Sequence, residues 1–297
     1  MGPYDPQDPT EEIVVKAYYQ WVPFMLFLQA CMFYGPHLLY KLAEGGKVRN
    51  ILGSIHLFVL DKEKRSGAVG DLAKYFAETQ GIHNSWGVGI LLTKTVYLAN
   101  VVAQIFFTNM FLGYEFTRYG AQVSSFLEIG DKDRMDPMSR VFPRVTKCTF
   151  HKFGPSGSIQ RHDAQCILPI NIINEKIYVF LWFWFIFLAV LTAVDLLVTV
   201  GQAVLPSVRW LVLTRKLRLV PKFKSEELRA KIDVRLILRD LQFGDWQLMY
   251  AIIVNMDGIT YAEWLEALTQ QARDKEELKG ADRAPLLQQQ RFLAQAT

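Results

Sequence analysis

Three long apolar stretches alternate with polar segments along the chain. They cover residues 17–40, 88–113 and 177–200. A helix rises about 1.5 Å per residue, so about 20 apolar residues cross a hydrocarbon core of about 30 Å. The third stretch is the clearest, because residues 177–194 contain no charge, proline or glycine and show no polar stripe. The alternation predicts a membrane protein with three helical spans.

The first two stretches contain polar or helix-breaking residues. Gln29 is expected to face another helix, because an amide that faces lipid is costly. Pro23 and Pro36 are expected to kink or end the first helix locally. Lys94 interrupts the second stretch, and it either snorkels to the near interface or faces a wet interior.

The polar segments between the stretches predict smaller elements. Residues 68–79 are expected to form a short helix. Two strand-like runs flank the turn formed by Gly154, Pro155, Ser156 and Gly157, and they predict a hairpin within residues 114–176.

The tail after the third stretch predicts a small helical domain. An amphipathic helix is expected from Ser225 to about Leu241, and Asp245 is expected to cap a second helix. Thr260 and Glu263 match a capping box for a third helix, which is expected to run to Lys279. The last residues are expected to be loose.

Composition and charge exclude several classes of protein. Apolar residues make up 51% of the chain and charged residues 21%, so sizeable aqueous parts accompany the spans. The net charge is only +4 and the basic residues are dispersed, which argues against nucleic-acid binding. The sequence contains no hydrolase triad motif, phosphate loop or dinucleotide fingerprint. No catalytic residue, cofactor or enzymatic activity is therefore expected.

Basic residues indicate how the chain is oriented in the membrane. A cluster follows the third stretch, at Arg209, Arg215, Lys216, Arg218, Lys222 and Lys224. The positive-inside rule predicts that residues 201–297 are cytoplasmic. Counting back through the spans, residues 41–87 are cytoplasmic, whereas residues 1–16 and 114–176 are extracellular. An outer N-terminal segment without a leader is awkward to insert, and a span upstream of the chain would remove this difficulty.

Two cysteines and two histidines have the spacing of zinc ligands. Cys148 precedes His151, and His162 precedes Cys166. The predicted extracellular location favours disulfides, which the cysteines form with each other or with partners outside this chain. Metal binding is the alternative. The remaining cysteine, Cys31, lies in an apolar stretch and is expected to pack as a small core residue.

Ordered motifs along the chain resemble the innexins, the gap-junction proteins of invertebrates. The signature Tyr18-Tyr19-Gln20-Trp21 opens the first stretch. Further matches resemble the second extracellular loop, the fourth span and the tail of that family: Asp136–Met138, Val141–Lys152, Gly154–Ser158, His162-Asp163, Cys166–Pro169, Asn174–Lys176, Tyr178–Phe185 and Gly244–Trp246. The similarity covers nearly the whole chain.

The resemblance implies an all-α transmembrane helix bundle with four spans per subunit and cytoplasmic termini. A small α/β extracellular loop region and a helical cytoplasmic domain would complete it. The three stretches correspond to the second, third and fourth spans. The family's N-terminal helix, first span and most of its first extracellular loop have no counterpart here. By the resemblance, Cys148 and Cys166 would be linked to cysteines of that first loop.

The function implied by the resemblance is that of a gap-junction subunit in the plasma membrane. Subunits would form homo- or hetero-oligomers with other innexins in the lipid bilayer and dock with an apposed channel on the neighbouring cell. The expected docking residues are Lys147, His151, Gly154, Pro155, Gly157 and His162. The alternatives are a non-conducting regulatory subunit that co-assembles with full-length relatives and a membrane-anchored metal-binding protein.

Overall fold

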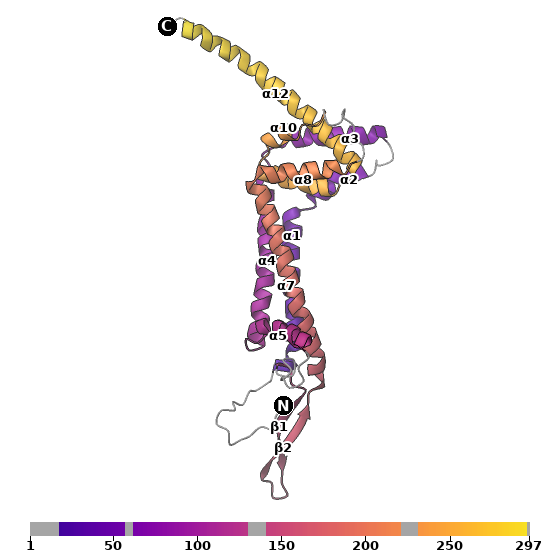
Figure 1. Cartoon of the computed structure of the whole chain (residues 1–297), viewed down its shortest axis with the longest axis vertical. Coiled ribbons are helices and arrows are strands. Elements are labelled where there is room, and N and C mark those ends of the chain that lie inside the picture. Colours follow the sequence, from indigo (N-terminus) through magenta and orange to yellow (C-terminus); the bar gives the residue numbers. More distant parts are fainter. Residues whose placement is uncertain (1–17, 57–61, 130–140, 221–230, 296–297) are drawn as a thin grey trace. The chain divides into compact units, whose positions relative to one another are not determined.

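The computed structural model describes residues 18–56, 62–129, 141–220 and 231–295 (Figure 1). The chain divides into two compact units. The first, called here the hairpin unit, comprises Met1–His37 and Val96–Val194. The second, called the tail unit, comprises Leu38–Thr95 and Asp195–Thr297. Each unit is described by itself.

Within the residues that the structure describes, three helices are long and apolar enough to cross a membrane. They are α1 (Val22–Glu44), α4 (Asn84–Phe111) and α7 (Pro169–Val204). Many of their large apolar side chains are exposed, as lipid-facing side chains are. The predicted class, a helical membrane bundle with a small sheet, is therefore confirmed. Pro36 lies inside α1 and does not end it.

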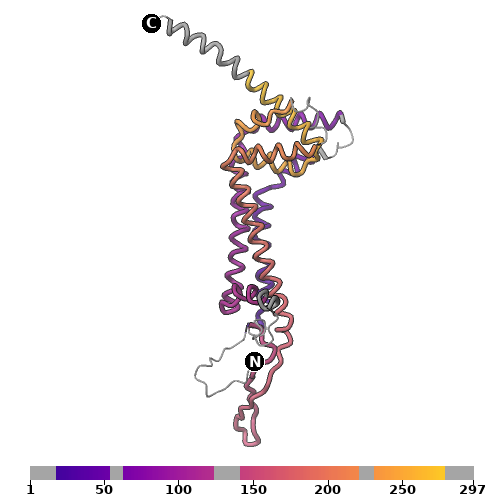
Figure 2. Tube along the Cα trace, in the orientation of Figure 1, coloured from indigo at the N-terminus to yellow at the C-terminus, as the bar shows by residue number. Residues whose placement is uncertain are grey.

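The hairpin unit is built around aromatic side chains. Its parts of α1, α4 and α7 run side by side (Figure 2), and α5 (Phe116–Ile129) packs against α7. Phe142 stacks on Tyr178 with ring centroids 5.2 Å apart, and it meets Tyr119 edge to face. The 3-10 helix η1 (Tyr18–Gln20) leads into α1.

A two-stranded antiparallel sheet projects from this core. It consists of β1 (Val145–Phe153) and β2 (Ile159–Ile167), paired from Val145 opposite Ile167 to Phe153 opposite Ile159. The two runs predicted around the glycine-rich turn are these strands.

The tail unit joins segments from before and after the last two long helices. Before them lie α2 (Lys47–His56) and α3 (Lys62–Glu78), and α3 includes most of the helix predicted at residues 68–79. After them lie α8 (Pro206–Arg218), α10 (Val234–Arg239), α11 (Phe243–Val254) and α12 (Gly258–Gln295). Their shared core includes Phe76, Leu213, Trp246, Ile252 and Trp264.

Several predicted helix boundaries in the tail are wrong. Asp245 does not cap α11: it lies inside the first turn, and its carboxylate accepts a hydrogen bond from the Gly81 N–H. Asp257 caps α12 by accepting from the N–H groups of Ile259 and Thr260. Helix α12 continues past Lys279 to Gln295 rather than ending there. Ser225, the expected start of the first tail helix, lies outside the described residues.

Candidate functional site

The hairpin of β1 and β2 is the candidate functional site because it carries the expected docking residues. Its turn is closed by backbone hydrogen bonds. The Gly154 N–H donates to the Ser158 carbonyl at 2.8 Å, and the Gly157 N–H donates to the Gly154 carbonyl at 2.9 Å. Gly157 has a φ of 75°, a left-handed conformation that glycine adopts without a steric penalty. Pro155 lies within this turn.

The two faces of the hairpin carry different chemistry. Side chains alternate between faces, so Lys147, His151 and Asp163 lie on one face and Cys148 and His162 on the other. Cys148 is half-buried, and the other four residues are exposed. Lys147 Nζ lies 2.8 Å from Asp163 Oδ2, and this hydrogen bond lowers the pKa of the Asp163 carboxyl.

Cys148 and Cys166 form a disulfide with each other, with Cα atoms 5.9 Å apart. This is one of the two pairings that the sequence left open. It differs from the pairing implied by the family resemblance, in which each would join a cysteine of another loop. Cys31 is exposed on α1, contrary to the expected packing role.

The geometry does not favour the metal-binding alternative. Both thiols are used in the disulfide, and His151 lies on the opposite face of the hairpin from the cysteines. Among the residues with described placement, no group of three or more His, Cys, Asp or Glu side chains could hold a metal ion.

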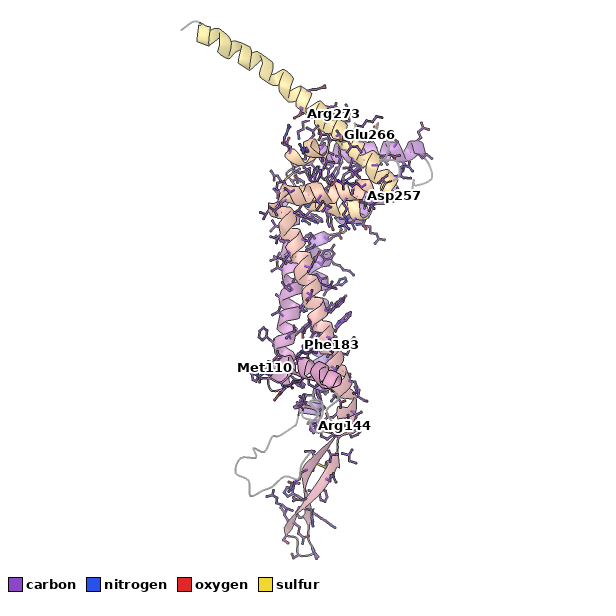
Figure 3. All side chains as sticks on the ribbon, viewed as in Figure 1. Met110, Arg144, Phe183, Asp257, Glu266 and Arg273 are labelled. Carbon is purple, nitrogen blue, oxygen red and sulfur yellow. A yellow bond between two sulfur atoms is a disulfide. The ribbon has the colours of Figure 1, made fainter. Side chains whose placement is uncertain are left out.

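An ion pair with one fully buried partner joins α7 to the base of the hairpin, where Figure 3 labels Arg144. Arg144 Nη2 lies 3.0 and 3.3 Å from the two oxygens of Glu175, whose side chain is fully buried. Lys176 Nζ lies 2.8 Å from the same carboxylate. Asn171 Nδ2 donates to the Pro143 carbonyl at 2.8 Å. We call Arg144, Glu175 and Lys176 the base clamp.

The sequence reasoning missed the base clamp. Arg144 and Glu175 are 31 positions apart, and no periodic pattern links them. A charged residue directly before an apolar span was the available signal. It indicates an interface position but does not identify a partner.

The signature Tyr18-Tyr19-Gln20-Trp21 divides into inward and outward side chains. The Tyr18 hydroxyl donates to the Val141 carbonyl near the start of β1, and its ring meets Phe142 edge to face at 6.0 Å. Gln20 Nε2 donates to the Tyr19 hydroxyl at 3.0 Å. Trp21 is 62% exposed. Tyr18 therefore anchors the start of α1 beside the hairpin, whereas Trp21 is available to lipid or a partner.

Gln29 and Lys94 make polar contacts between the spanning helices. Gln29 Nε2 on α1 donates to Thr108 Oγ1 on α4 at 2.7 Å, which confirms that Gln29 faces another helix. Within the tail unit, Lys94 Nζ on α4 lies 2.9 Å from Asp195 Oδ2 and 2.8 Å from Thr199 Oγ1 on α7. Lys94 is thus paired with a carboxylate, which neither sequence-based alternative anticipated.

Comparison with known proteins identifies similar sequences along nearly the whole chain. The profile of the Innexin family matches residues 4–272. Innexin inx2 of Schistocerca americana is 41% identical over 266 residues, which cover 90% of this chain and 72% of that protein. Innexin inx2 of Drosophila melanogaster is 40% identical over 261 residues, covering 88% and 69%. Innexin inx3 of the same species is 37% identical over 270 residues, covering 91% and 64%.

Proposed function

The chain belongs to the innexin family, and from this membership we propose that it is a subunit of an intercellular channel that passes ions and small molecules between cells. Innexins are gap-junction membrane proteins and act as channels. The observation that carries the proposal is the family match over residues 4–272, which includes all three membrane helices and the hairpin. We infer that the chain forms oligomers with copies of itself or with other innexins.

We propose that residues 41–87 and 201–297 are cytoplasmic and that residues 114–176 are extracellular. The tail unit supports this arrangement, because α3 packs against α12. Arg65 on α3 contacts Glu263 on α12 through two hydrogen bonds of 2.9 and 3.0 Å. Two membrane helices, α4 and α7, lie between these elements in the sequence. Helices that pack in one aqueous unit must lie on the same side of the membrane, and the basic residues after α7 favour the cytoplasm.

We propose that the hairpin docks with an apposed channel. An isolated two-stranded ribbon is marginally stable in water, so it needs support at its base. The base clamp and the disulfide supply that support, and Phe150, Phe153 and Ile159 remain exposed on the ribbon. Lys147, His151 and His162 add polar contacts, while Gly154, Pro155 and Gly157 shape the tip.

Junctional conductance between paired cells tests the proposal. The full chain is expressed in both cells, and its delivery is measured by surface labelling. We expect conductance between the cells, and we expect Arg144→Met to reduce it at equal surface delivery because the hairpin loses its support. Absence of conductance despite surface delivery would contradict the proposal. If a co-expressed full-length innexin conducts less in the presence of this chain, the function would instead be regulatory.

A further inference from the structure

His83 lies in the tail unit where segments distant in sequence meet. It directly precedes α4, and it is 3% exposed. Its Nδ1 lies 2.9 Å from Lys47 Nζ at the start of α2, and its Nε2 lies 3.2 Å from Thr79 Oγ1 after α3. An ammonium group only donates hydrogen bonds, so Nδ1 accepts and carries no proton. The Thr79 hydroxyl donates to the Tyr75 carbonyl, so it accepts from Nε2–H. These contacts fit a neutral imidazole.

The charged groups around His83 come from several elements. Lys47 on α2 is closest, and Asp245 on α11 is the acidic counterpart. The Asp245 carboxylate is fully buried, and its Oδ2 accepts from the Gly81 N–H at 2.8 Å. The ring of Tyr75 on α3 lies near the His83 imidazole, with the two ring centroids 6.5 Å apart. Glu44 on α1 accepts from two backbone N–H groups at the start of α2.

The backbone around His83 touches the start of α11 directly. The Gly244 N–H donates to Asn84 Oδ1 at 3.0 Å. A Cβ atom on Gly244 would lie 2.2 Å from the His83 carbonyl oxygen, and one on Gly87 would lie 2.6 Å from the Gly244 Cα. Only glycines allow this approach. Displacement of His83 would therefore disturb the contact between residues 79–87 and α11.

We propose that His83 is an acid-released latch that holds residues 79–87 against α11. When a proton from solvent binds Nδ1, the acceptor lone pair that faces Lys47 is lost and two cations lie about a hydrogen-bond length apart. The contact with Lys47 then opens, and residues 79–87 separate from Gly244 and Asp245. This regulation is a property of the tail unit, and it does not depend on whether the chain conducts.

The direction of the pH dependence follows from the pKa of His83. Burial, and then the positive charge of Lys47, lower this pKa below its usual value, and Asp245 opposes them only partly. A histidine with a lowered pKa in the folded state stabilises that state fully above its ordinary pKa of about 6.5. The contribution is lost as the pH falls below that value. The latch is therefore closed at neutral pH and opens in acid.

Amide hydrogen exchange tests the latch on the full chain in lipid nanodiscs. Protection of peptides covering residues 79–87 and 242–248 is measured at pH 7.5 and 5.5, after correction for the intrinsic exchange rate. We expect a loss of protection of up to about ten-fold at pH 5.5, because this pH lies about one unit below the ordinary pKa of a histidine. His83→Gln keeps a neutral hydrogen-bonding side chain and should abolish this loss. His162→Gln, which changes an exposed histidine on β2, should retain it.

A second variant keeps the proposal testable if His83→Gln does not fold. Lys47→Met removes the cation that opposes protonation, so the acid-dependent loss should shrink. The proposal is overturned if the natural chain keeps its protection at pH 5.5. It is also overturned if His83→Gln or Lys47→Met loses protection in acid as fully as the natural chain.

Discussion

The contribution of the base clamp to stability depends on one buried side chain, that of Glu175. Glu175 is fully buried, whereas the side chain of Arg144 is 49% exposed. Replacing Arg144 with Met would leave the carboxylate with Lys176 as its remaining cation. Because a buried charge is costly when a partner is removed, we expect a loss of about 1–3 kcal/mol in the free energy of unfolding. Thermal unfolding in detergent micelles measures it.

The control for this prediction is Lys152→Met, which removes a cation from an exposed position on β1. It should change the free energy of unfolding by less than about 0.5 kcal/mol. The double variant Arg144→Met, Glu175→Gln should recover part of the loss, because it removes the buried negative charge as well. Equal effects of Arg144→Met and Lys152→Met would show that the clamp contributes nothing to stability.

The ion pair between Lys94 and Asp195 is a second charged contact whose contribution to stability can be tested. Lys94→Met leaves the Asp195 carboxylate without its ammonium partner on α4, so it should destabilise the protein by about 1 kcal/mol. The exchanged pair Lys94→Asp, Asp195→Lys restores opposite charges and should be more stable than either single variant of that exchange. The measurement is the midpoint of thermal unfolding. An exchanged pair less stable than both single variants would rule out a direct interaction.

At the scale of single residues, the sequence indicated the surroundings of a polar side chain more readily than the identity of its partner. Gln29 could be assigned to a helix contact, because an amide inside an apolar stretch has few other options. Lys94, His83 and Arg144 could not be paired in advance. Their partners lie 101, 36 and 31 positions away, and charge alone does not reveal which distant residue a fold brings close.

Among the elements, α5 depends on close approach to α7. A Cβ atom on Gly120 would lie 2.0 Å from the ring of Trp182, whereas one on Gly35 in α1 would meet nothing within 4 Å. Gly120→Ala must displace the indole, and such overpacking should cost about 1–3 kcal/mol. Gly35→Ala should stabilise α1 by up to about 1 kcal/mol, because alanine is the better helix former.

Thermal unfolding of the two glycine variants provides a matched comparison, since each adds one methyl group to a helix. Near-ultraviolet circular dichroism adds a signal from the displaced indole. If Gly120→Ala were as stable as Gly35→Ala, the close packing of α5 on Trp182 would be refuted.

Helix ends were harder to predict than helices. The stretch from Ser225 to Leu241 suggested one helix, yet Asp233 caps the short α10 within it. Asp245 resembled a cap by its position before an apolar run, but its carboxylate is used in a contact with Gly81. Glu263 fitted a capping box and instead pairs with Arg65. For Asp245 and Glu263, a tertiary contact determined the role of a side chain that the local pattern had assigned to capping.

At the scale of the whole molecule, the sequence predicted the three candidate membrane helices found among the described residues, and it predicted the hairpin, because both depend on local patterns. Apolar length identifies a span, and glycine with proline between strand-like runs identifies a turn. The assembly of the tail unit was not predictable in this way. It depends on contacts between α3 and α12, such as the pair Arg65 and Glu263, which are 198 positions apart.

Orientation in the membrane is a prediction for the whole chain. An epitope inserted after Gly157 should be labelled by antibody on intact cells, because residues 114–176 are proposed to be extracellular. An epitope added after Thr297 should be labelled only after permeabilisation. Surface delivery of both tagged chains is checked by biotinylation. Labelling of the first epitope only after permeabilisation would reverse the proposed topology.

The pairing of α3 with α12 has a consequence for biosynthesis. The ribosome completes α3 long before α12, and α4 and α7 must be inserted in between. A nascent chain with one inverted span would leave the two helices in different compartments, and their apolar faces would stay uncovered. Quality-control chaperones bind such surfaces. The chain would therefore escape them only when α3 packs against α12, which requires correct membrane insertion of the spans in between.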